Sequence, residues 1–99
     1  YRLTETAEDD VIDIYRYTAE HFGAAQADAY HRKLEATFAL LGENPFIARE
    51  RAEIDPPVRA HPCGAHMILY VVRNEASVLI VRVRHAREDW LSSGSSSDP

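Results

Sequence analysis

The sequence predicts a small α+β domain in which a hairpin of two helices packs on an antiparallel β-sheet. Three observations predict this class. Two consecutive segments of the first half repeat apolar residues with the period of a helix, about 3.6 residues. The second half contains two apolar, β-branched runs separated by a short polar turn. A chain of 99 residues is long enough for one core only, and therefore for one domain.

The first segment, Tyr1-Arg2-Leu3, has the character of a short strand, and Thr4 after it can cap a helix. Acidic residues follow in the first turns, where the positive end of the helix dipole favours them. We expect these carboxylates to face solvent and to serve no catalytic purpose: Glu5, Glu8, Asp9, Asp10 and Asp13.

Two helices are expected next. The first presents one face made of Ala7, Val11, Ile14, Thr18 and Phe22, and Gly23 ends it. The second presents a stripe made of Ala27, Tyr30, Leu34, Phe38 and Leu41, and Gly42 with Asn44-Pro45 ends it. Because a single glycine joins them, the helices are predicted to form an antiparallel hairpin.

A polar connector is expected from Pro45 to Pro57, followed by three strands. The strands are predicted at 58–62, 67–72 and 78–85, and residues 73–76 form the turn between the last two. The serine-rich residues 92–99 contain no core-forming side chain, so we expect them to be disordered and the domain to span 1–91.

The last strand alternates in a way that predicts its two faces. Side chains on a strand point to opposite faces in turn. Leu79, Val81 and Val83 would then face the helices, while Arg82 and Arg84 would lie on the open face with Ile80.

Composition and charge exclude several classes of protein. The chain carries a net charge of −5, so it is not a uniformly basic nucleic-acid binder. The charge is uneven, however, because five arginines and one glutamate lie between Arg59 and Arg87. No apolar run is long enough to span a membrane, and no signal peptide opens the sequence. One cysteine, Cys63, forms no internal disulfide, so we expect a cytoplasmic protein.

The sequence shows no strong signature of a metal or cofactor site. His61, Cys63 and His85 lack the paired spacing of zinc ligands, so no metal is predicted. Cys63 has no evident orienting partner and is interpreted as structural rather than as a nucleophile. The chain has no glycine-rich phosphate loop, and no cofactor is predicted.

The arginine-rich end of the last strand is the clearest candidate for a functional surface. It is either a solvated sheet face or an interface, and arginine with tryptophan favours an interface. We therefore expect the target-binding surface to comprise Arg82, Arg84, His85, Arg87 and Trp90. A ribonuclease would need a general acid and base beside phosphate-binding arginines, and part of such a set exists in Arg59, Arg82, His85 and Arg87.

Taken together, the blocks of the sequence resemble the ParE/RelE superfamily of toxins, and most closely its ParE branch. The resemblance runs from Tyr1 to about Leu91. Its carriers are Tyr1-Arg2-Leu3-Thr4, Ala7-Glu8-Asp9-Asp10-Val11, Ile14-Tyr15-Arg16-Tyr17-Thr18, Asn44-Pro45, Val58-Arg59, Pro62-Cys63-Gly64-Ala65-His66-Met67-Ile68-Leu69-Tyr70 and Val81-Arg82-Val83-Arg84-His85-Ala86-Arg87-Glu88-Asp89. It implies a strand, a helical hairpin and an antiparallel meander.

The same resemblance implies the toxin of a bacterial type II toxin–antitoxin system. Such a toxin is neutralised by a cognate, usually ParD-like, antitoxin in a hetero-oligomer. ParE-type toxins are associated with inhibition of DNA gyrase, whereas RelE-type relatives cleave messenger RNA on the ribosome. DNA would be contacted only through the antitoxin or gyrase.

Departures from the RelE pattern favour the ParE interpretation. Met67 falls where RelE-type nucleases carry a basic residue, Lys33 is the only lysine, and the chain has Trp90-Leu91 where those nucleases use a tyrosine. The alternatives are a ribosome-dependent endoribonuclease and an inactive toxin that still binds its antitoxin.

We expect the antitoxin to lay apolar side chains along the helical hairpin and the sheet edge. Helix-in-groove contacts and an added strand are the two modes of binding considered. The contact residues should be apolar side chains that the core does not need, namely Tyr15, Tyr17, Phe46 and Ile47.

Overall fold

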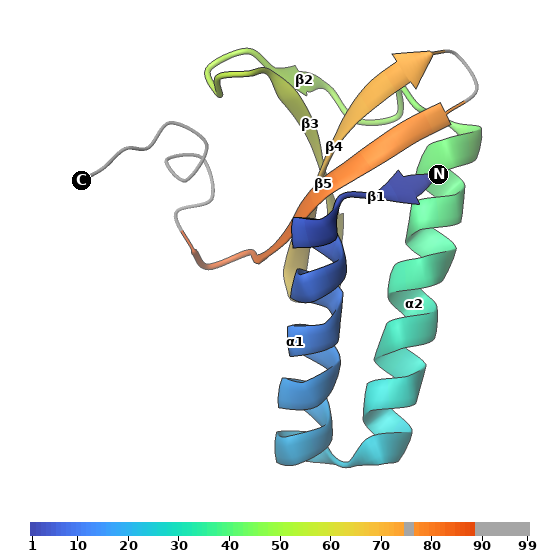
Figure 1. The fold of residues 1–99 in the computed structure, drawn as a ribbon, viewed down its shortest axis with the longest axis vertical. Helices are drawn as coiled ribbons and strands as arrows, with labels where there is room; N and C mark the ends of the chain where they lie inside the picture. The colour runs from blue at the N-terminus through green and yellow to red at the C-terminus, as the bar shows by residue number, and fades with distance from the viewer. Residues whose placement is uncertain (75–76, 89–99) are drawn as a thin grey trace.

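The computed structural model describes residues 1–74 and 77–88 and shows two helices packed on a five-stranded sheet (Figure 1). The α+β class is therefore confirmed. In chain order the elements are β1 (Arg2–Leu3), α1 (Glu5–Phe22), α2 (Ala24–Glu43), β2 (Glu50–Arg51), β3 (Val58–Cys63), β4 (His66–Asn74) and β5 (Ser77–His85). Residues 89–99, which include Trp90 and the predicted disordered tail, lie outside the described residues.

The helical hairpin forms as predicted, with one exception. The Thr4 hydroxyl accepts a hydrogen bond from the Ala7 N–H at 3.0 Å, which caps α1. Gly23 joins the helices at a φ of +94°, which a glycine tolerates best. Phe22 was predicted to face the core but is 61% exposed. Figure 1 gives the reason, because the hairpin extends beyond the sheet at its turn.

The sheet is mixed rather than antiparallel. Its strand order is β1-β5-β4-β3-β2, and the meander from β2 to β5 is antiparallel as expected. β1 instead runs parallel to β5, with Arg2 opposite Leu79 and Leu3 opposite Ile80. Both helices and the strands β2 to β4 separate β1 from β5 in the sequence.

A β-bulge makes the predicted faces of the last strand wrong for the residues up to Val81, whereas Val83 faces the core as predicted. Leu69 pairs with Arg82 while Tyr70 pairs with Ile80, so Val81 is an extra residue in β5. The alternation shifts by one residue there. Val78, Ile80 and Val83 are consequently in the main core, and Val81 packs in a second cluster.

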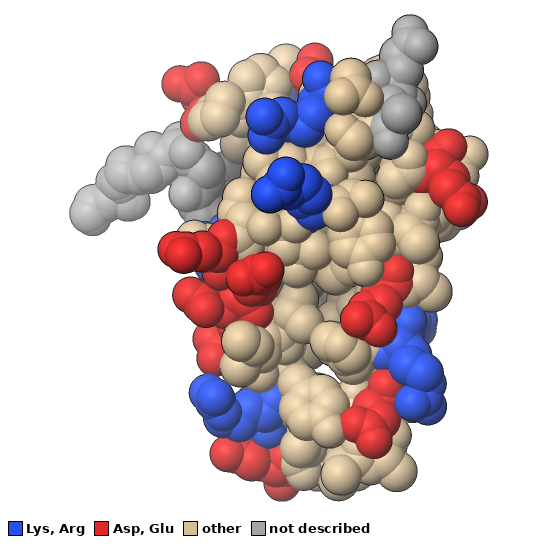
Figure 2. Space-filling model, turned by 45° about the vertical axis from the view of Figure 1, so that its right-hand side comes forward, with Lys and Arg blue, Asp and Glu red and all other residues tan. Residues whose placement is uncertain are grey.

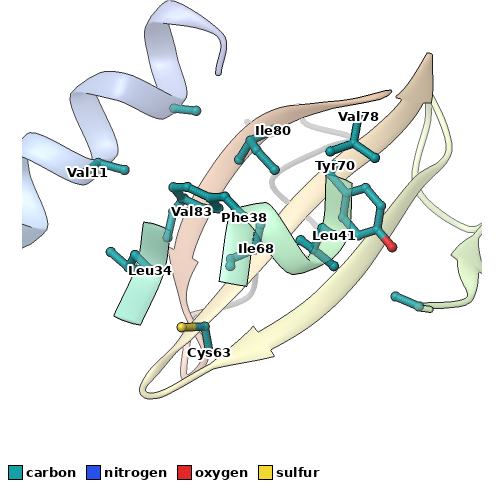
Figure 3. Packing of buried hydrophobic residues seen from close by; sticks show 12 residues of the cluster. Val11, Leu34, Phe38, Leu41, Cys63, Ile68, Tyr70, Val78, Ile80 and Val83 are labelled. Atoms are coloured by element: carbon teal, nitrogen blue, oxygen red, sulfur yellow. The ribbon is translucent and has the colours of Figure 1, made fainter. Parts of the chain in front are cut away.

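The main core lies between the hairpin and one face of the sheet. Figure 3 shows Leu34, Phe38 and Leu41 of α2 directed toward the strands, with Val11 of α1 beside them. These side chains pack against the sheet residues Cys63, Ile68, Tyr70, Val78, Ile80 and Val83.

The opposite face of the sheet is partly covered rather than open. Ile54, Val58 and Leu69 form a second buried cluster there, against which Ala60, Val71 and Val81 pack. The connector after α2, predicted to be a polar loop, supplies Ile54 and the short strand β2. It also buries Ala48 in the main core. Within the described part of the chain, no helix is long and apolar enough to cross a membrane.

Candidate functional site

An open groove of about 710 Å³ lies between α1 and the second half of β5. It exists because β1 covers β5 only at Leu79 and Ile80, so that among residues 1–74 and 77–88 no strand pairs with the following residues of β5 on that side. The lining from α1 includes Asp10, Ile14, Tyr17 and Phe22. The lining from the other side includes Tyr30, His66, Arg82, Val83, Arg84, His85 and Glu88.

Asp10 and Arg82 join the two walls at one end of the groove. Arg82 Nε and Nη2 donate to the Asp10 carboxylate at 2.8 Å and 3.2 Å, and the Val83 N–H donates to the same carboxylate at 2.9 Å. The Asp10 side chain is only 15% exposed. Two expectations are therefore wrong: Asp10 does not face solvent, and Arg82 is not free on an open sheet face. The reason is that β1 does not reach Arg82 and Val83. The Asp10 carboxylate of α1 accepts the main-chain hydrogen bond that a neighbouring strand would otherwise accept.

A second ion pair lines the same groove. Arg84 Nε donates to Glu88 Oε1 at 2.8 Å, and this bond holds the pKa of Glu88 below its usual value. Nearby, His85 Nδ1 accepts a hydrogen bond from the Arg87 N–H at 3.0 Å, while Arg87 itself is exposed. Both groove arginines are thus paired with acids.

Two histidines meet across β4 and β5, and sequence reasoning did not identify the pair. His66 lies opposite His85 in the register, and their ring centroids are 5.4 Å apart in an edge-to-face arrangement. Tyr30 Oη lies 2.6 Å from His66 Nδ1, donates to the Cys63 carbonyl at 3.1 Å and accepts from the Ala65 N–H at 3.1 Å. Burial, and then the neighbouring His85, lower the pKa of His66. The pair could not be identified from the sequence because it depends on the register between the two predicted strands.

The candidate nuclease residues are only partly brought together. Arg82 and His85 line the groove, but Arg59 and Arg87 are not among its lining residues. Arg59 Nη1 donates to the Ala48 carbonyl at 2.6 Å, and its guanidinium lies over the Phe46 ring at 5.0 Å. Arg59 and Arg82 are therefore engaged in contacts that hold the fold. Trp90, the remaining member of the predicted target surface, falls beyond the described residues.

The candidate antitoxin-binding residues are exposed, and they fall in two regions. Tyr15 and Tyr17 lie in the half of α1 nearer to Gly23, whereas Phe46 and Ile47 follow α2 at the other end of the hairpin. Tyr17, Phe46 and Ile47 are more than half exposed, at 57%, 59% and 51%. Tyr17 lines the groove and stacks on His21, with ring centroids 4.0 Å apart.

Charge is distributed unevenly over the helical hairpin. Figure 2 shows a strip of uncharged side chains over the lower half of the molecule, between two flanks that carry acidic side chains and separate basic groups. Among residues 1–74 and 77–88, no group of three or more His, Cys, Asp or Glu is arranged to hold a metal ion.

Comparison with known proteins gives a consistent set of relatives. Residues 1–90 match the family described as the ParE toxin of the type II toxin–antitoxin system parDE. The chain is 37% identical to Toxin ParE of Escherichia coli over 94 residues, which cover 93% of this chain and 89% of that one. It is 34% identical to Toxin ParE1 of Mycobacterium tuberculosis over 89 residues, which cover 90% and 91%.

The fold is also shared with a solved structure. The chromosomal ParDE toxin–antitoxin system from P. aeruginosa contains a chain that superposes with a TM-score of 0.72 at 17% identity. The match covers 85% of this chain and 91% of that one, so nearly the whole architecture is common to both.

Proposed function

This chain belongs to the ParE toxin family of type II toxin–antitoxin systems, and we propose that a ParD-like antitoxin neutralises it and that it binds and inhibits DNA gyrase in the bacterial cytoplasm. The observation that carries the antitoxin half of the proposal is the exposed aromatic surface on and beside the groove. Tyr17 and Phe22 line the groove and are 57% and 61% exposed. Large apolar side chains that the core leaves uncovered are typical anchors of protein interfaces.

The groove chemistry supports a protein-binding toxin more than a nuclease. Both groove arginines are paired with Asp10 or Glu88, and these carboxylates compensate the positive charge that would attract a phosphate. The groove does hold two imidazoles, of His66 and His85, which is the observation that favours a ribonuclease as the second candidate. An inactive chain that still binds its antitoxin is the third.

One pair of experiments separates these functions. The purified chain is added to a DNA gyrase supercoiling assay with and without the antitoxin encoded by the neighbouring reading frame. We expect inhibition by the chain alone and its relief by the antitoxin. In cells that express the chain, we expect broken DNA and an SOS response.

Cleaved transcripts with intact gyrase activity would instead establish the ribonuclease. Binding of the antitoxin without toxicity in cells and without inhibition of gyrase would establish the inactive chain. Failure of the antitoxin to bind at all would overturn the proposed pairing.

A further inference from the structure

We infer that the edge of β5 from Val83 to His85 accepts an extended segment of the antitoxin through two main-chain hydrogen bonds. The partner is that of the proposed function, on which the inference rests. The starting point is the ladder between β4 and β5, which decides which main-chain groups of β5 point away from β4.

Hydrogen-bonded and non-hydrogen-bonded pairs alternate along an antiparallel ladder. The Ala86 N–H donates to the Ala65 carbonyl at 2.8 Å, one step beyond the pairing of His66 with His85. Arg84 therefore exchanges its main-chain bonds with β4, whereas Val83 and His85 direct theirs to the outer edge. The bond from the Val83 N–H to Asp10 on α1 confirms this alternation independently.

On the outer edge of β5, the main-chain groups on both sides of this segment have hydrogen-bond partners. The Ile80 and Val81 carbonyls accept from the Thr4 N–H and hydroxyl at 3.0 Å and 3.1 Å. The Val83 N–H is held by Asp10, and the His85 carbonyl accepts from the Glu88 N–H at 3.0 Å. Two groups remain without a partner among residues 1–74 and 77–88, the Val83 carbonyl and the His85 N–H.

An acceptor and a donor at this spacing match an extended chain. In a parallel arrangement, one partner residue donates its N–H to Val83 and accepts from His85 with its carbonyl; in an antiparallel arrangement, two residues share these roles. A helix in the groove would leave both groups unpaired, because its own main-chain groups bond within the helix. Asp10 and Glu88 occupy the adjoining positions, so the added strand is limited to these two bonds.

The surroundings of the edge define the chemistry of the segment. Arg82 is paired with Asp10 and Arg84 with Glu88, so the groove offers little uncompensated charge beside the edge. The facing wall carries the exposed rings of Tyr17 and Phe22. An uncharged, apolar segment is complementary to this combination, and its side chains would cover the two rings.

The test compares two variants that lose the same side chain. His85→Ala keeps the main-chain N–H, whereas His85→Pro removes it at an outward-facing edge position, where proline is tolerated. The dissociation constant of each variant for the antitoxin of the neighbouring reading frame is measured by calorimetry, and thermal melting verifies folding. We expect His85→Pro to bind at least about fivefold more weakly than His85→Ala, because the partner carbonyl loses its donor.

Amide hydrogen exchange of the unaltered chain provides a second measurement that needs no variant. We expect the antitoxin to slow exchange at the His85 N–H, while the Val83 N–H, already bonded to Asp10, is protected with and without it. Equal affinity of the two variants, or unchanged exchange at His85 in a complex that forms, would overturn the added strand and leave the proposed function standing. No binding of the antitoxin would overturn both.

Discussion

Asp10 of α1 and Val83 of β5, separated by 73 positions in the sequence, are joined by a hydrogen bond of 2.9 Å from the Val83 N–H to the Asp10 carboxylate. The bond satisfies a main-chain donor at the point where β1 has ended. The same carboxylate pairs with Arg82, so one acidic side chain fixes α1 against the sheet edge and neutralises an arginine of the groove.

Removal of the Asp10 carboxylate should destabilise the fold. We expect Asp10→Ala to lower the free energy of unfolding by about 2–4 kcal/mol, because it leaves the Val83 N–H and the Arg82 guanidinium without their partner. The measurement is unfolding in urea. Asp9→Ala, at an exposed neighbouring position, should change stability by less than about 0.5 kcal/mol. Equal effects of the two variants would contradict this role of Asp10.

A side chain at position 64 should be poorly tolerated. Gly64 has a φ of +58°, and an added Cβ would lie 2.7 Å from the Tyr30 ring. We expect Gly64→Ala to cost about 2–4 kcal/mol from backbone strain and overlap with Tyr30. Gly42→Ala is the control, because its Cβ would make only ordinary van der Waals contacts with Tyr1. Gly42 lies within α2, so this change should stabilise the chain by up to about 1 kcal/mol. A melting temperature for Gly64→Ala equal to that of the unaltered chain would refute the expectation.

Stability should fall as the pH decreases below about 6.5, the usual pKa of histidine. Burial and His85 lower the pKa of His66 in the folded state, so the unfolded chain binds a proton more readily in this range. His66 therefore contributes stability above pH of about 6.5, and this contribution is lost as the pH falls through its folded pKa. Urea unfolding between pH 5 and 8 measures the effect. The slope over this range should be smaller in His66→Asn, whose side-chain amide does not titrate and can donate a hydrogen bond to the Tyr30 hydroxyl oxygen. An unchanged slope would assign the effect to another group.

Substitutions of Arg82 and Arg87 should distinguish a structural role from a role in target binding. Arg82→Ala loses the ion pair with Asp10 and should reduce stability as well as toxicity, whereas Arg87→Ala alters an exposed side chain and should leave the melting temperature within about 1–2 °C. If the predicted target surface is right, Arg87→Ala still reduces growth inhibition while antitoxin affinity is kept. Full toxicity of Arg87→Ala, and of the Arg84→Ala, His85→Ala and Trp90→Ala variants, would refute that surface.

Side chains of the two exposed apolar regions should contribute to antitoxin binding but little to the stability of the free chain. We expect Tyr17→Ala and Phe46→Ala to weaken the complex by about 1–2 kcal/mol each with little change in the melting temperature of the free chain. Loss of the Phe46 ring also removes a contact of Arg59, so the Ile47→Ala variant serves as a second probe of that region. Antitoxin titration followed by calorimetry gives the affinities. Unchanged affinity of all three variants would place the contact elsewhere.

The sequence by itself determined the helical hairpin and three strands of the meander, β3, β4 and β5. Thr4, Gly23 and the two apolar stripes are local signals, and local signals decide where a helix begins, ends and presents its apolar face. The exposure of Phe22 could not be read from the same stripe, because the length of sheet available to cover it is a tertiary property.

Only the tertiary structure decided the edge of β5 and the groove beside it. The parallel pairing of β1, the bulge at Val81 and the capture of Arg82 by Asp10 each depend on residues far apart in the sequence. A bulge moves every following side chain to the opposite face, and no period in the strand itself signals where it occurs. For that reason the arginines of β5 were recognised from the sequence as a candidate surface, whereas the groove, its two ion pairs and its histidine pair arise only when the strands are in register.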